Sequence, residues 1–395
     1  MRSPGLPLHL TAATLLRVSA EGLATALVLT VHARTGDAAT AGFLQTALLL
    51  PYVLSGPVIG HTLDRVARPR RVAVALAGVY GVATAALLAV AGASPLVLAL
   101  TIAVVIGLTE PIVVALTSLL PRFVPPDRLP RAYGLEASSY NVAAIAGPGL
   151  AAGVASVAGG AYAGAAIVAG AVVGVLALML LPLPGPGETH DPAATPRDSI
   201  RTIVGGGLGV LFGNRVLRAL TVGTTFAWTG FGGVAITAVL LARHLGADEA
   251  VGGRLLVAMA VGSLAGSLAS SRWLTARHAE RVMLLGLVAF GAALASLAVV
   301  PDVAWAMAAF AAAGVAEGPV FAATLMLRQR EAPPGRLGQV NTTAGSLKIG
   351  ASAIGAGLTG ALASTAGPIG LVLAIAACPL LGAATAAVLL RARSS

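Results

Sequence analysis

Long apolar segments follow one another along almost the whole chain, and they constrain the fold more than any other feature. About twelve of them run for roughly 19–28 residues, which is enough to cross the ~30 Å hydrocarbon core of a bilayer as α-helices. A helix satisfies its own backbone amides in lipid, and the runs are too long for barrel strands. The composition agrees, with 57% hydrophobic and 10% charged residues and a mean hydropathy of +0.90. The predicted spans are 10–32, 39–63, 71–91, 95–120, 132–157, 161–181, 216–241, 250–271, 282–300, 303–327, 337–364 and 368–390. The sequence therefore predicts an all-α polytopic membrane protein.

Two stretches 207 positions apart nearly repeat each other, and each places a glutamate inside an apolar span. They read Gly107-Leu-Thr-Glu110-Pro111 and Gly314-Val-Ala-Glu317-Gly-Pro. Each is followed by a Pro-Pro and an Arg-Leu, at 125–129 and 333–337. The chain is therefore interpreted as a duplicated unit: an N-terminal six-helix bundle at 1–182, a cytoplasmic linker with a surface helix at 183–214, and a C-terminal six-helix bundle at 215–395. Duplicated halves with polar groups at their interface are typical of secondary transporters.

The net charge of +10 is a topology signal. If the N-terminus is cytoplasmic and the sides alternate, most of the 25 Lys and Arg residues fall on the cytoplasmic side, while Arg17 and Lys348 fall within spans. This positive-inside pattern predicts that both termini are cytoplasmic. The excess of Arg over Lys favours a bacterial plasma membrane. The expected partners are the lipid bilayer and a small-molecule substrate, without nucleic acid, for a monomer. Cys378 is the only cysteine and the histidines lack ligand spacing, so no metal site is expected.

The loop after the second span carries a signature. It reads Gly60-His-Thr-Leu-Asp64-Arg65-Val-Ala-Arg68 and resembles the cytoplasmic signature of the major facilitator superfamily, although Thr and Ala replace its usual Leu and Gly. The resemblance implies the fold of that family, with about twelve transmembrane helices in two pseudo-symmetric six-helix bundles. It also implies that Gly60, Asp64, Arg65 and Arg68 form a conformational latch, where charges stabilise helix ends.

Further stretches resemble the drug and siderophore exporter branch of this superfamily. They are Arg17 in the first span, the segment 119–131, Asn141, and Gly147-Pro148 in the fifth span. The chain departs from that branch in having Ala151-Ala152 where a Gly-Gly pair is usual. It also offers Glu110-Pro111 in the fourth span in place of a membrane arginine often linked to proton transfer.

The polar residues inside the spans are the candidates for a substrate and proton pathway, because a charge in hydrocarbon is costly and usually kept for function. Arg17 and Glu21 are four residues apart on one helix face and are predicted to pair, either structurally or in binding. If the halves pack as in the family, Glu110 and Glu317 face each other and exchange a proton. The alternative is a protonated or hydrogen-bonded carboxyl near a helix end.

The only lysine lies in the middle of the eleventh span. Lys348 shares a predicted helical stripe with Asn341, Ser352 and Thr359, and it either neutralises a glutamate or meets an anionic substrate. The side chains of Tyr140, Asn141 and Trp228 are predicted either to contact a cavity or to pack.

Missing motifs exclude several functions. The lysine is followed by Ile349, so no phosphate loop ending in Gly-Lys-Ser/Thr exists, and neither a His-Glu-x-x-His nor a Gly-x-Ser-x-Gly hydrolase motif occurs. The prediction is a non-enzymatic secondary active transporter that works by alternating access. It would carry out proton-coupled efflux of a small amphipathic or cationic compound, with no cofactor and a proton gradient as the energy source. An uptake permease for a small metabolite and a non-transporting sensor or scaffold stay open as alternatives.

Overall fold

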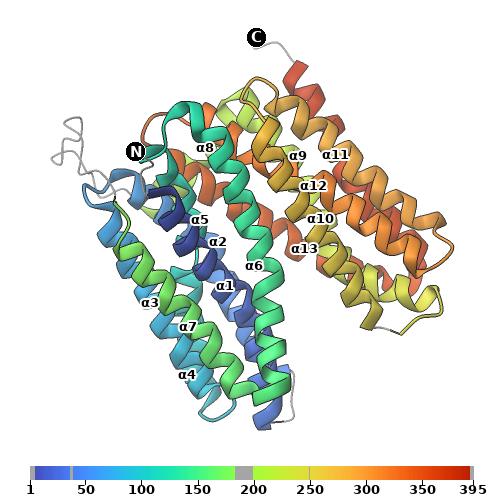
Figure 1. The fold of residues 1–395 in the computed structure, drawn as a ribbon, viewed down its shortest axis with the longest axis horizontal. Helices are drawn as coiled ribbons and strands as arrows, with labels where there is room; N and C mark the ends of the chain where they lie inside the picture. Colours follow the sequence, from blue (N-terminus) through green and yellow to red (C-terminus); the bar gives the residue numbers. More distant parts are fainter. Residues whose placement is uncertain (1–4, 36–38, 183–198, 249, 392–395) are drawn as a thin grey trace. The chain divides into compact units, whose positions relative to one another are not determined.

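The computed structural model describes residues 5–35, 39–182, 199–248 and 250–391, and these residues form helices without a strand (Figure 1). The elements of the first half of the sequence are α1 (Gly5–Thr35), α2 (Ala39–Arg65), α3 (Pro69–Val90), α4 (Leu96–Thr109), α5 (Ile112–Ala115), η1 (Leu116–Arg122), η2 (Pro126–Arg128), α6 (Leu129–Ala158) and α7 (Gly160–Met179). They are followed by α8 (Ile200–Gly213), α9 (Arg215–His244), α10 (Ala250–Trp273), α11 (Ala279–Ser296), η3 (Leu297–Val299), α12 (Val303–Glu331) and α13 (Leu337–Arg391).

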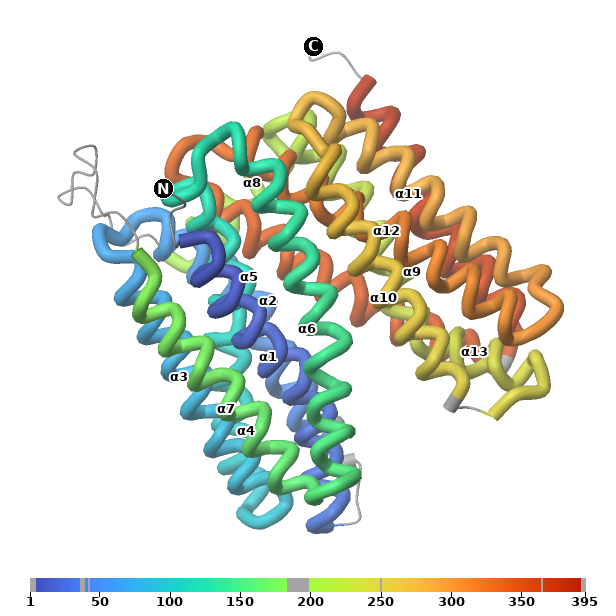
Figure 2. Tube along the Cα trace, in the orientation of Figure 1, coloured from blue at the N-terminus to red at the C-terminus, as the bar shows by residue number. Residues whose placement is uncertain are grey.

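The described residues contain 12 helical segments long and apolar enough to cross a membrane, which confirms the predicted number. The predicted spans 337–364 and 368–390 both fall within α13 (Figure 2, orange to red). The predicted fourth span is divided among α4, α5 and η1. The helix predicted within the linker is α8, whereas residues 183–198 of the linker lie outside the described residues.

The chain divides into two compact units. The first consists of residues 1–126, 142–207 and 333–346, and the second of residues 127–141, 208–332 and 347–395. The first unit has a core of buried apolar side chains from α1 to α5 and from α7. The second has its own core from α9 to α13. The N-terminal part of α6 therefore belongs to the second unit, and the N-terminal part of α13 belongs to the first.

Two glycines 208 positions apart join consecutive spans without a loop. Gly159 lies between α6 and α7 with φ 97° and ψ 166°, and Gly367 lies within α13 with φ 65° and ψ 171°. This backbone region is accessible essentially only to glycine. The duplication detected in the sequence therefore extends to the backbone conformation of these joints.

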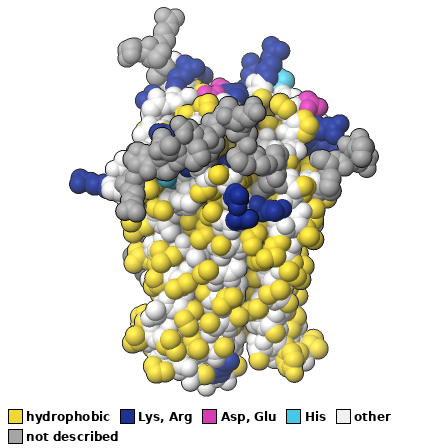
Figure 3. Space-filling model, turned by 90° about the vertical axis from the view of Figure 1, so that its left-hand side faces the viewer, with side chains coloured by type: hydrophobic (Ala, Val, Ile, Leu, Met, Phe, Trp, Pro, Cys, Tyr) yellow, Lys and Arg dark blue, Asp and Glu magenta, His cyan; other side chains and the backbone are white. Residues whose placement is uncertain are grey.

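The surface is that of an integral membrane protein. On the face shown in Figure 3, hydrophobic side chains cover the middle and lower part, and Lys and Arg side chains gather towards the upper end. Large apolar side chains are widely exposed, among them Leu50, Val82 and Leu285 at 70–72%. A soluble monomer rarely exposes so much contiguous apolar surface, whereas lipid solvates it.

Candidate functional site

The repeated motif of the first unit interrupts a helix. Pro111 has no N–H to donate to the carbonyl oxygen of Gly107, four residues earlier, and α4 ends at Thr109. The hydroxyl of Ser55, on α2, donates to this Gly107 oxygen at 3.1 Å. At Gly107 the two helices lie so close that a Cβ would be 2.0 Å from the Leu48 oxygen. The break is therefore stabilised by a side chain of the neighbouring helix.

Arg17 is bound by the segment that follows the break. Its side chain is 2% exposed, and Nε and Nη2 donate to the Val113 oxygen at 3.3 and 3.1 Å. Nη2 also donates to Thr117 Oγ1 at 3.1 Å. The predicted ion pair of Arg17 with Glu21 is not among these bonds and stays a prediction. A carbonyl and a hydroxyl accept from the guanidinium, because the turn after Pro111 presents both of them to α1.

Glu21 and Glu110 interact with each other, which the sequence analysis did not predict. Glu21 is exposed on α1 and interacts electrostatically with Glu110, the residue that ends α4. Tyr80 of α3 is fully buried beside them, and its hydroxyl lies 3.3 Å from Ser19 Oγ. The first unit thus collects two carboxylates and a phenol from three helices. Glu110 and Glu317 belong to different units, so their predicted approach stays a prediction.

In the second unit, Glu317 takes part in a hydrogen-bonded chain of side chains. The Ser263 hydroxyl, on α10, contacts Glu317 Oε2 and lies 3.0 Å from Asn141 Oδ1. Asn141 Nδ2 donates to Ser267 Oγ at 2.9 Å, and Ser267 Oγ donates to the backbone oxygen of Ser263 at 2.6 Å. Two predicted site residues, Asn141 and Glu317, are therefore linked through a serine that the sequence analysis did not single out.

A cavity of the second unit lies beside this chain. It is small, with a volume of about 20 Å³. The Lys348 ammonium lies 5.3 Å from the Trp228 ring centroid and 5.5 Å from that of Phe321, within the range of cation–π attraction. The lining residues are Thr224, Ala227, Trp228, Phe231, Leu287, Phe290, Glu317, Val320, Phe321, Thr324 and Lys348.

The remaining candidates near the cavity have packing roles as well. The Tyr140 ring meets that of Phe321 edge to face, with centroids 5.0 Å apart. On α13, Lys348 is buried together with Asn341 and Thr359, and Ser352 is half-buried. The predicted stripe is therefore a largely buried face of that helix.

Asp64 caps the start of α13. Its Oδ1 accepts from the backbone N–H of Gly338 at 2.7 Å, and its Oδ2 accepts from that of Gln339 at 2.8 Å. A carboxylate at this position satisfies two orphan N–H groups and complements the helix dipole. A Cβ on Gly60 would lie 2.3 Å from the Gly338 oxygen, so only glycine allows α2 and α13 to approach this closely. Two residues of the predicted latch thus have a structural reason for their identity.

The arginines around Asp64 interact with it or bind helix ends. Arg65 and Arg122 both interact electrostatically with Asp64. Arg122 Nη2 also donates to the Leu63 oxygen near the end of α2, at 3.2 Å. Arg70 Nη1 donates to Leu181 O, just beyond α7, at 3.2 Å, whereas the side chain of Arg68 is exposed. The expected preference of arginines for carbonyl ends is observed at two helices.

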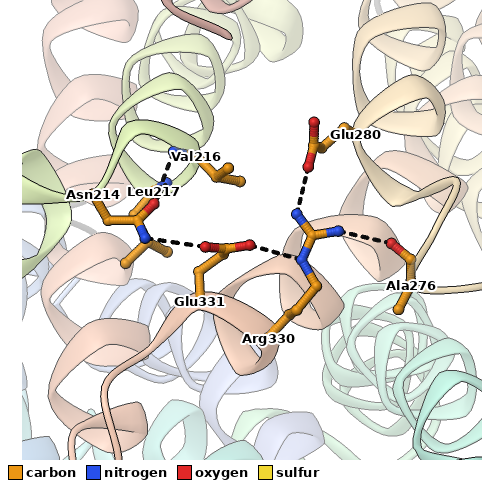
Figure 4. A network of polar contacts seen from close by, with 7 residues as sticks. All are labelled: Asn214, Val216, Leu217, Ala276, Glu280, Arg330 and Glu331. Atoms are coloured by element: carbon orange, nitrogen blue, oxygen red, sulfur yellow. Dashed lines mark hydrogen bonds and ion pairs between the residues drawn. The ribbon is translucent and has the colours of Figure 1, made fainter. Parts of the chain in front are cut away.

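A second polar network fixes one end of α12 (Figure 4). Arg330 pairs with Glu280 of α11 and with Glu331, and donates to the Ala276 oxygen at 2.9 Å. Asn214 caps α9 through its side-chain oxygen and donates from Nδ2 to Glu331 at 3.0 Å. This exposed network links α9, α11 and α12 in the second unit.

Sequence reasoning missed three residues. Glu136 is fully buried in α6, and its position inside a predicted span was a sufficient signal. Arg328 was assigned to the loop because the predicted span ended one residue earlier, yet α12 continues to Glu331 and the side chain is 3% exposed. Ser263 had no signal, since its role depends on which helix packs against α12.

Comparisons with known proteins agree with this architecture. The family model described as "Major Facilitator Superfamily" matches residues 10–237 and 220–395. An uncharacterized MFS-type transporter, y4rN, of Sinorhizobium fredii is 27% identical over 372 residues, covering 90% of this chain and 88% of the relative. The fold is similar to that of the human organic anion transporter MFSD10 (TETRAN), with a TM-score of 0.81, 16% identity and coverage of 97% and 98%.

Two further solved structures share the fold. A bacterial homologue of the iron transporter ferroportin, in an outward-facing state, has a TM-score of 0.76 at 16% identity, with 97% of this chain and 98% of that chain covered. The E. coli fucose:proton symporter FucP has a TM-score of 0.74 at 15% identity and covers 100% of both chains. With a family model that matches nearly its whole length and twelve apolar spans, the chain belongs to the major facilitator superfamily of transporters.

Proposed function

We propose that the protein is a proton-coupled secondary transporter that exports a small amphipathic compound, with Glu317 as the residue that binds and releases the proton. We further propose that the protein acts as a monomer in a bacterial plasma membrane, with both termini in the cytoplasm. Membership of the transporter family supports secondary transport. The single observation that carries the proton step is the hydrogen-bond balance around Ser263.

The Ser263 hydroxyl has one proton but contacts two acceptor oxygens, Glu317 Oε2 and Asn141 Oδ1. With a neutral Glu317, the carboxylic acid donates to Ser263 and Ser263 donates to Asn141, so every group is satisfied. With an ionised Glu317, Ser263 donates to the carboxylate and Asn141 Oδ1 loses its donor. Rotating the amide by 180° restores the balance only if the Ser267 hydroxyl gives up its bond to the Ser263 backbone and donates to the amide oxygen instead.

The charge state of Glu317 is therefore linked to the bond between α6 and α10. Losing one hydrogen bond at the half-buried Asn141 costs about 0.5–1.5 kcal/mol, which is a sizeable part of the free energies that separate transporter conformations. Asn141 is the last residue of α6 that belongs to the second unit, so a change in its bonding occurs where α6 passes from one unit to the other. This position supports a role for the proton in switching.

The test uses proteoliposomes with an imposed pH gradient and three matched aryl probes, namely p-toluenesulfonate, p-toluenesulfonamide and benzyltrimethylammonium. Glu317→Gln retains a donor to Ser263 and is expected to fold, to bind and to exchange substrate at equal pH. It is expected to lose gradient-driven transport. Glu280→Gln, which removes a carboxylate from the exposed network on α11, is the control and should retain both activities.

Gradient-driven transport by Glu317→Gln at the wild-type rate would contradict the assignment of the proton to Glu317. Glu110→Gln and the double variant then show whether the first unit carries the proton instead. If the double variant also responds to the gradient, neither glutamate couples transport to protons. An uptake permease would concentrate a probe in right-side-out vesicles, and an exporter in inverted ones.

A further inference from the structure

One face of α12 continues from the cavity to a buried arginine. Glu317, Phe321, Thr324 and Arg328 are spaced by four, three and four residues, so they lie above one another on the same face of the helix. The first three line the cavity. Arg328 lies one turn beyond Thr324, outside the cavity lining and towards the end of α12.

Two residues of this face, Thr324 and Arg328, have polar atoms without hydrogen-bond partners in the described residues. Arg328 is 3% exposed, and its Nε and Nη2 atoms have no hydrogen-bond partner. Thr324 is fully buried, and its Oγ1 has none either. Burial of an unpaired cation costs several kcal/mol, and such groups are normally paired or bind an ion. These groups are therefore positioned to bind a ligand that is not part of the chain.

The charge balance around the cavity is positive. Lys348, 6% exposed on α13, interacts electrostatically with Arg328 and with Glu317. Tyr140 of α6 interacts with Arg328 as well. The lining residues from α9 and α11 carry no charge. Counting the lining residues and Arg328, two cations thus accompany one carboxylate, and when Glu317 takes up its proton this set carries no negative charge.

We propose that Arg328, Thr324 and Lys348 form a buried anion subsite that binds the negatively charged group of an amphipathic substrate at the base of the cavity. Guanidinium and hydroxyl groups suit a carboxylate, sulfonate or phosphate. The rings of Trp228 and Phe321 then contact the apolar part of the substrate. The inference rests on the proposed transport function, and it replaces a cationic substrate by an anionic one. A free inorganic anion such as chloride has the same chemistry and is the second possible source.

The test measures binding to the full-length protein in nanodiscs. Trp273 and Trp305 are 51% and 63% exposed, so Trp273→Phe and Trp305→Phe are tolerable and leave Trp228, under Lys348, as the only fluorescent indole. The sulfonate probe is expected to bind about tenfold more tightly than the sulfonamide, as a hydrogen bond to a charged group requires. Arg328→Gln should remove this preference, Arg328→Lys should retain part of it, and Arg330→Gln, on the exposed end of the same helix, should leave it unchanged.

The outcomes distinguish an inorganic anion from an amphipathic substrate, and they distinguish a failure of the anion subsite from a failure of the proposed transport function. A change in Trp228 fluorescence with chloride alone, lost in Arg328→Gln, supports the subsite and identifies an inorganic occupant. Equal binding of sulfonate and sulfonamide, or an Arg328→Gln variant that keeps the preference, would overturn the subsite. A third outcome is that benzyltrimethylammonium binds best and that the proton gradient drives its export only when Glu317 is present. The subsite is then wrong, while the proposed function stands.

Discussion

In the first copy of the repeated motif Pro111 ends a helix, whereas in the second copy Pro319 lies inside one. Both prolines lack the N–H that the carbonyl four residues earlier would accept. Gly107 O obtains a donor from Ser55, and the chain turns into α5 and a 3₁₀ helix. In the second copy α12 continues to Glu331. A proline motif alone therefore does not determine a helix break. The break also depends on whether the neighbouring helix donates a hydrogen bond to the carbonyl that the proline leaves without a partner.

The serines of the two neighbouring helices explain the different surroundings of the glutamates. Ser55 binds a backbone oxygen, so Glu110 ends its helix without that hydroxyl. Ser263 contacts the carboxylate of Glu317 directly. Gly318 allows this contact, since a Cβ there would be 2.3 Å from the Ser263 oxygen. The inserted glycine of the second copy thus brings α10 against α12, and only that copy has a serine positioned to exchange a proton with its glutamate in the described residues.

The largest expected effect tests the feature that both copies share. Gly107→Ala and Gly314→Ala should each lower the free energy of unfolding by about 1–3 kcal/mol. A Cβ would be 2.0 Å from Leu48 O in the first case and 1.9 Å from Met259 O in the second. The midpoint of unfolding in SDS measures the change. Gly153→Ala is the control, because nothing lies within 4 Å of its Cβ position, and helix propensity should make it slightly stabilising. A Gly314→Ala variant as stable as the wild type would show that the second copy does not depend on a close approach of its helices.

The next prediction removes the prolines. Pro111→Ala supplies an N–H that competes with Ser55 for Gly107 O, which should extend α4 and displace the Val113 oxygen from Arg17. Transport should fall about tenfold, the equivalent of ~1.4 kcal/mol in a conformational equilibrium. Pro319→Ala adds an N–H inside a helix that is already continuous, so transport should change less than about twofold while stability rises. Equal losses in the two variants would remove the basis of the comparison.

The latch allows a third test of the comparison. In the second half Ser271 precedes Arg272, at the position equivalent to Asp64 and Arg65 in the first half. Ser271 donates to its own helix, at Leu268 O, rather than capping another. Asp64→Ser should therefore weaken the cap of α13 by about 1 kcal/mol and slow transport, with equilibrium binding of the p-toluenesulfonate probe within a few-fold. Asp64→Asn is the milder variant of the same shape. Loss of binding in a folded Asp64→Ser variant would show that the residue does more than control switching.

The smallest effect distinguishes the two serines. Ser55→Ala and Ser263→Ala each remove one hydrogen bond, worth about 0.5–1.5 kcal/mol of stability. Ser55→Ala should leave the pH profile of transport unchanged, since its acceptor is a backbone oxygen. Ser263→Ala should shift the pH at which transport is half-maximal, because it alters the contact of Glu317. Identical pH profiles would separate Ser263 from the proton step.

Sequence reasoning predicted the spans and the duplication because both follow from local composition and spacing. It also predicted the cluster of charged residues at the end of α2. Glu317 and Lys348 both attracted attention because they lie in apolar spans, and they line one cavity. The bond from Arg17 to Val113 O was not predicted, because spacing along one helix says nothing about the carbonyls that another helix presents. The burial of Arg328 depended on how far α12 extends beyond its apolar run.

The one-residue joints at Gly159 and Gly367 also have a mechanical consequence. A connection with no spare chain cannot lengthen, so a force applied to one helix of each pair is transmitted at once to the next. When the protein is pulled from a bilayer by one terminus, α6 and α7 should leave as one hairpin, and the two spans of α13 as another. Insertion of a short flexible segment at either glycine would divide that single extraction step into two.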